Sequence, residues 1–148
     1  MSNKKSLFSI ILYNSLASGA VLGASALIPP LSGLALAAVM FLPAPLILYQ
    51  LNKLNLTGGA DMNQYFAAGS ACGFFAFLGF SLAYLPAAFI LHLIFKTEAF
   101  LWVKVMLGNA GYILAIVILT ALLCGLFNMF SAFITAYFSE YLRPKNRG

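Results

Sequence analysis

The chain alternates long apolar segments with short polar ones, and the apolar lengths predict helices that cross a membrane. From Ser6 to Phe95 only Lys53 and Asp61 are charged, and both fall in one polar island at residues 52–64. A spanning helix needs about 20 predominantly apolar residues. The predicted spans lie at about 7–28, 31–51, 65–95 and 107–129.

Prolines, glycines and charges mark the ends of these spans. Pro29-Pro30 ends the first span, because proline lacks the N–H that a helix needs. Gly58-Gly59 predicts a turn inside the polar island. The segment Lys96–Glu98 ends the third span. The fold class is therefore an all-α integral membrane protein, a single polytopic domain over residues 1–148.

The last apolar stretch, from Ala99 to Phe138, is too long for one span. As one helix it would measure about 60 Å, twice the hydrocarbon thickness. We expect a span at 107–129 and then a helical arm with a basic tail at 130–148 that extends into the cytoplasm. The predicted fold is a four-transmembrane-helix bundle, and a fifth span within this stretch is the alternative.

Two prolines break the second predicted span. Pro43 and Pro45 leave the carbonyls of Val39 and Phe41 without their usual helix donors. Unpaired carbonyls in hydrocarbon cost several kcal/mol each, so water, a solute or a neighbouring polar side chain must satisfy them. The candidate polar and binding region comprises Asn14, Ser18, Ser25, Pro43, Pro45 and Asn109.

Small residues recur one turn apart on three of the predicted spans. Lipid gives no hydrophobic force between helices, so close backbone approach has to hold a bundle together. The candidate packing positions are Ser15, Gly19, Gly23, Gly69, Gly73, Gly108 and Gly111. Such faces serve either packing within one bundle or contact between copies in a homo-oligomer.

Composition and charge support a membrane protein with its termini in the cytoplasm. The chain is 63% hydrophobic and 7% charged, against about 25% charged in soluble domains. Four spans place both termini and the polar island on one side, which then carries most of the lysine and arginine. We expect the inner (cytoplasmic) membrane, no nucleic acid, and headgroup contacts by Lys4, Lys5, Arg143, Lys145 and Arg147.

The N-terminal span also fits a cleaved signal peptide. Lys4-Lys5 precedes its apolar run, and Ala24-Ser25-Ala26 resembles a small-residue cleavage site. Cleavage would leave three spans and an external N-terminus.

The residues that catalysis or metal binding would need are missing or scattered. His92 is the one histidine, and no acidic residue lies inside a predicted span. Cys72 and Cys124 have no metal-ligand or CxxC spacing, so we expect no metal and no cofactor. Catalytic motifs are also lacking, which predicts a protein that is not an enzyme.

Two functions fit this pattern. The first is a non-enzymatic subunit or accessory factor of a membrane complex, which acts through helix association. The alternative is a small oligomeric transporter or channel for a neutral or lipid-like solute, which uses the broken second helix. The expected partners are the lipid bilayer and either further copies or other membrane subunits.

Overall fold

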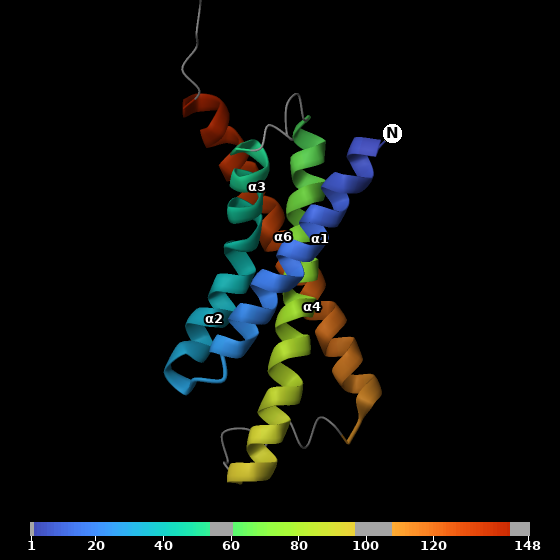
Figure 1. The fold of residues 1–148 in the computed structure, drawn as a ribbon, viewed down its shortest axis with the longest axis vertical. Helices are drawn as coiled ribbons and strands as arrows, with labels where there is room; N and C mark the ends of the chain where they lie inside the picture. The colour runs from blue at the N-terminus through green and yellow to red at the C-terminus, as the bar shows by residue number, and fades with distance from the viewer. Residues whose placement is uncertain (1, 54–60, 97–107, 143–148) are drawn as a thin grey trace, which may run out of the picture.

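The computed structural model describes residues 2–53, 61–96 and 108–142, and these residues form a bundle of α-helices (Figure 1). The helices are α1 (Ser2–Ser25), α2 (Pro29–Phe41), α3 (Pro43–Lys53), α4 (Met62–Phe95) and α6 (Ala110–Leu142). The described residues contain no strand, so the all-helical prediction is confirmed for them. Arg143, Lys145, Arg147 and Gly58-Gly59 lie outside the described residues, as do the side chains of Lys4 and Lys5.

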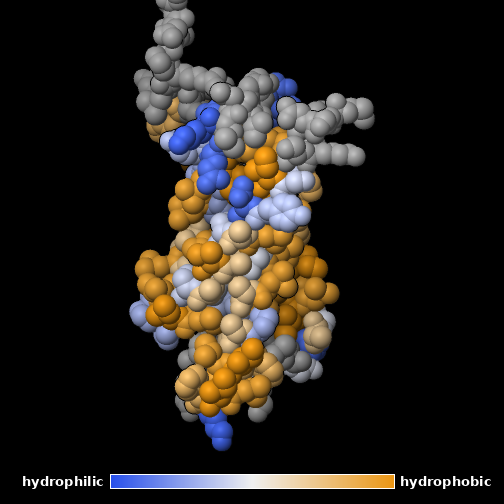
Figure 2. All heavy atoms as spheres, viewed as in Figure 1, coloured by the Kyte–Doolittle hydropathy of each residue, from blue (hydrophilic) through white to orange (hydrophobic). Residues whose placement is uncertain are grey.

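Three helices of the described chain are long and apolar enough to cross a membrane. They are Leu7–Ser25 of α1, all of α4, and Ala110–Phe138 of α6. Helices α2 and α3 provide a fourth span if the pair, which bends by 50° at its break, counts as one. Hydrophobic side chains cover most of the face in Figure 2, and hydrophilic ones gather towards its upper end. These lengths and compositions indicate a multi-pass membrane protein with three or four spans.

Helix α4 lies at the centre of the bundle. It packs against α1 on one side and α6 on another, and the α2–α3 pair lies against the same three helices. Figure 1 shows the start of α1, the end of α3, the start of α4 and the end of α6 at the same end of the bundle. The chain therefore runs up and down the bundle, with four passes if the bent α2–α3 pair counts as one span.

The first helix ends earlier than the sequence pattern predicts. α1 ends at Ser25, and Ile28 already has an extended backbone (φ −86°, ψ 111°). A residue before proline is disfavoured in the helical region, so the chain leaves the helix ahead of Pro29. Pro29 and Pro30 then begin α2, where a missing N–H removes no helix hydrogen bond.

The segment after residue 129 joins the bundle rather than leaving it at once. We expected the helix to continue from Phe130 as an arm, and α6 does continue unbroken to Leu142. Ala132, near the start of this segment, is fully buried. Ala132 belongs to the same apolar cluster as Leu48 and Cys72. At least the first turns of the expected arm therefore pack on α3 and α4.

Glycines bring the helix backbones close together. A Cβ on Gly19 would collide with the Ala76 carbonyl, and one on Gly23 with the Phe80 carbonyl. On the other face of α4, a Cβ on Gly73 would lie 2.7 Å from Asn128, and one on Gly69 would meet Ala132. These four positions lie where α4 contacts α1 and α6, with backbones near enough for van der Waals packing to hold the helices.

Gly108 and Gly111 lie elsewhere. Both are exposed at the start of α6, and a Cβ on Gly111 would find only the Asn109 side chain, at 3.7 Å. Within the described bundle, Gly111 therefore makes no close contact with another helix.

The two cysteines provide a direct test of this packing. Cys72 and Cys124 are free thiols with no exposed surface, on helices α4 and α6. We expect neither thiol to react with a bulky maleimide in the folded protein, and both to react after denaturation in SDS, because a buried thiol is inaccessible. Counting labelled cysteines by mass spectrometry measures this, and fast labelling of the folded protein would contradict the packing.

Candidate functional site

The break between α2 and α3 is closed by the side chain of Asn128. Its carboxamide Oδ1 accepts a hydrogen bond from the Ala44 N–H (2.9 Å). Its Nδ2 donates to the carbonyls of Met40 (2.7 Å) and Val39 (3.1 Å), and to Cys124 of its own helix (3.0 Å). An amide group has two N–H donors, so three carbonyls share them.

This geometry replaces the backbone hydrogen bonds that the prolines prevent. In an unbroken helix, Val39 would accept from residue 43 and Met40 from residue 44. Pro43 has no N–H, and the bend separates Met40 from Ala44. The Asn128 carboxamide lies between the Met40 carbonyl and the Ala44 N–H and forms a hydrogen bond with each, as a peptide group would. Asn128 is fully buried, so the pairing occurs away from lipid.

Asn128 also joins the two main apolar clusters of the core. Val39 and Cys124 belong to the cluster around Phe77 and Phe80. Ala44 belongs to the other, with Ile47 and Leu51. The hydrogen bonds of Asn128 therefore fix how α2 and α3 sit on α6 at the point where the clusters meet.

Among the described residues, the polar side chains predicted to satisfy the break make no hydrogen bond to it. Ser18 and Ser25 donate to carbonyls one turn earlier in α1, Ser15 (3.0 Å) and Leu22 (2.8 Å). Asn109 is exposed and accepts from the N–H of Tyr112 (3.3 Å) at the start of α6. Pro43 is buried and Pro45 half-buried at the break itself.

Ser15 lies on the inner face of α1. It is fully buried and faces Cys72 of α4. Ser15 lies beside the glycines through which α1 contacts α4, so it acts as a packing residue.

Three residues of the candidate polar and binding region line a groove on the outer surface, which we call the α1–α3 groove. It measures about 420 Å³ and includes Asn14, Ser18 and Pro43. Gln50, which is outside the predicted region, lines it too. Asn14 and Gln50 are exposed, and neither carboxamide makes a hydrogen bond to any described residue. The groove thus presents unpaired amides on an apolar exterior.

The described part of the chain holds no group of three His, Cys, Asp or Glu side chains that could bind a metal ion. Comparisons of the chain with protein-family models, with curated proteins and with solved structures give no match.

Proposed function

We propose that the protein is a non-enzymatic subunit of a membrane complex and that its α1–α3 groove receives a transmembrane helix of another subunit. One observation supports this most strongly. Three polar groups of the helix break, the carbonyls of Val39 and Met40 and the N–H of Ala44, are paired inside the bundle by Asn128. The carboxamides of Asn14 and Gln50, in contrast, are unpaired on its apolar outside.

An exposed asparagine in a spanning helix favours association with another helix. Asn14 lies near the middle of α1, about nine residues or roughly 13 Å from Lys5 along the helix. A carboxamide in hydrocarbon lacks hydrogen bonds that a partner helix would supply, and such contacts contribute about 0.6–2 kcal/mol each.

The groove has the shape that a helix needs. Its α1 side includes the small residues Ala17 and Ser18, and its α3 side includes the buried residues Pro43 and Ile47. The small residues let a partner backbone approach closely, and the larger exposed side chains Val21 and Leu46 flank the hollow.

The transporter alternative has less support. It needs the carbonyls at the helix break to be available to a solute, and Asn128 already donates to those of Val39 and Met40. We therefore favour the subunit. From the distribution of lysine and arginine we place it in the inner membrane, with both termini in the cytoplasm.

Photocross-linking in native membranes tests the proposal. A photoreactive amino acid at Val21 or Leu46, beside the groove, is expected to give adducts of fixed mass with a membrane protein. The same group at Leu119, exposed on α6, is expected to give no such adduct. An adduct of twice the chain's own mass identifies a second copy, and any other fixed mass identifies a different subunit.

Removing the two carboxamides is expected to weaken the adduct. The double variant Asn14→Leu with Gln50→Leu should lower its yield about tenfold, from two lost hydrogen bonds of about 0.7 kcal/mol each. Tyr13→Phe removes a polar group from an exposed position next to the groove and should leave the yield unchanged. Equal adducts from Leu119, or recovery of the protein only as a partnerless monomer in mild detergent, would contradict the proposal.

A further inference from the structure

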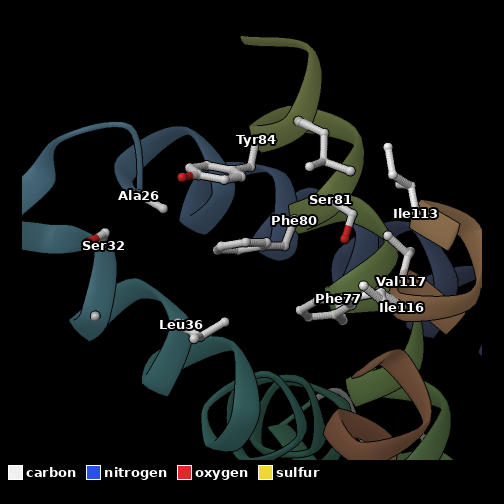
Figure 3. Close-up of a pocket in the computed structure, with 12 residues that line it drawn as sticks. Ala26, Ser32, Leu36, Phe77, Phe80, Ser81, Tyr84, Ile113, Ile116 and Val117 are labelled. Carbon is white, nitrogen blue, oxygen red and sulfur yellow. The ribbon is translucent and has the colours of Figure 1, made fainter. Parts of the chain in front are cut away.

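A second pocket lies between α2, α4 and α6, and it shares no lining residue with the α1–α3 groove. It has a volume of about 340 Å³ and is half-enclosed (Figure 3). Its α4 wall carries three rings in a row, with Phe77 stacked on Phe80 (5.7 Å between centroids) and Phe80 on Tyr84 (5.6 Å). Pockets of this size with mostly apolar walls and few polar groups are typical of small-molecule sites.

One polar side chain of this pocket has no partner. Ser81 is only 7% exposed, and its hydroxyl makes no hydrogen bond to a described residue. Figure 3 shows the hydroxyl on the pocket side of α4, towards Ile116 and Val117. Because this hydroxyl is on the pocket side and bonds to no described residue, a ligand with an acceptor oxygen would gain a hydrogen bond here.

A glycine keeps the opposite wall open. Gly33 lies inside α2, where glycine is less favourable than alanine by up to about 1 kcal/mol. The glycines on the inner faces of α1 and α4 meet backbone atoms, but a Cβ on Gly33 would have nothing within 4 Å. Packing within the described bundle therefore does not require a glycine here. Its missing side chain leaves room in the pocket.

We infer that this pocket binds an acyl chain that bears a carbonyl group. The chain would lie along Phe77 and Phe80, and the carbonyl oxygen would accept a hydrogen bond from Ser81. Acyl chains surround a spanning bundle and reach a half-enclosed pocket between its helices directly. The carbonyl of a free fatty acid and that of a diacyl lipid supply the same acceptor.

Photolabelling of the full chain tests the site. The protein is reconstituted in ether-linked phospholipid, which brings no carbonyl of its own, and labelled with a palmitic acid that carries a diazirine in mid-chain. The label is expected on the α4 segment from Phe77 to Leu85 or on the α2 segment from Ser32 to Leu36. Oleic acid and a diacyl phosphatidylglycerol serve as competitors, and hexadecane as the chain without a carbonyl.

The variants separate the pocket from the general lipid surface. Gly33→Phe fills the open space and should lower labelling at least tenfold. Leu34→Phe adds the same ring one residue away, at an exposed position outside the pocket, and should change nothing. Ser81→Ala should weaken binding of the labelled acid about three- to tenfold through the lost hydrogen bond.

The competitors decide the chemistry of the ligand. Competition by oleic acid alone identifies a free fatty acid, and competition by both carbonyl compounds identifies an acyl-lipid site; either result supports the inference. Equal competition by hexadecane, or equal labelling of Gly33→Phe and the unaltered protein, would overturn it. Protection of Cys72 and Cys124 from maleimide shows that each variant is folded, and Gly33→Leu replaces Gly33→Phe if the larger ring prevents folding.

Discussion

Replacing Asn128 with leucine is expected to lower the free energy of unfolding by about 3 kcal/mol. The change removes the donor to Val39 and Met40 and the acceptor for the Ala44 N–H. A buried polar group left unpaired costs about 1–3 kcal/mol. Hydrogen bonds between membrane helices contribute less, about 0.6 kcal/mol on average. We therefore use the lower end of that range, about 1 kcal/mol for each of the three groups left unpaired.

Unfolding by SDS from mild detergent, followed by the reactivity of Cys72 and Cys124, measures this loss. Asn14→Leu makes the same chemical change at an exposed asparagine that bonds to no described residue. It should alter stability by no more than about 0.5 kcal/mol. If the two variants lose the same stability, Asn128 does not hold the helix break.

A second substitution tests whether Asn128 replaces the backbone hydrogen bond that Pro43 prevents. Pro43→Ala restores an N–H that can donate to the Val39 carbonyl. Asn128→Leu should then be less destabilising, by about 1 kcal/mol, in the Pro43→Ala background than alone. A double-mutant cycle gives this coupling directly, and a cycle with no coupling would contradict the proposed replacement of backbone hydrogen bonds.

The sequence predicts the break but not the group that closes it. Pro43 and Pro45 identify the weak point because the missing N–H is a local property of proline. The partner depends on how neighbouring helices rotate about their axes, which the sequence of one helix does not determine. Asn14 comes directly before Ser15 and therefore points about 100° away from it. Because Ser15 and Gly19 face α4, Asn14 faces outward.

A signal for Asn128 was nevertheless present in the chain. It is an asparagine in the interior of a long apolar helix, one turn after Cys124 and Gly125. A polar side chain on the same face as small residues is typical of a helix contact rather than of a lipid face. Its distance of more than 80 residues from the break hid the pairing, since no local pattern connects them.

The spacing of small residues predicts a helix contact only where those residues lie in the interior of a helix. Gly69 and Gly73 lie well inside α4 and reach α6. Gly108 precedes the first residue of α6 and Gly111 is its second, and a Cβ on Gly111 would meet no atom of another described helix within 4 Å. The pocket at Ser81 and Gly33 has no sequence pattern at all, because its walls come from three helices.

Gly19→Ala is expected to destabilise the protein by about 2 kcal/mol. The added methyl would collide with the carbonyl oxygen, carbonyl carbon and Cα of Ala76. These are backbone atoms of α4 and cannot rotate away, so α1 has to move outward. Overpacking of this kind typically costs 1–3 kcal/mol.

Gly33→Ala is the matched control, because it adds the same methyl inside a helix where no atom lies within 4 Å. It should leave stability unchanged or raise it by up to about 1 kcal/mol, since alanine favours helix. The SDS and thiol measurement compares the two variants. Equal stability of Gly19→Ala and Gly33→Ala would mean that α1 and α4 do not approach as closely as the structure places them.

The effect of Gly19→Ala should extend to the α1–α3 groove, because Asn14 and Ser18 move with α1 while Gln50 stays on α3. We expect this variant to lose both stability and the photocross-link from Val21. The variant with Asn14→Leu and Gln50→Leu should lose the cross-link and keep its stability. Different results in these two assays distinguish a surface that binds a partner helix from packing that only holds the bundle together.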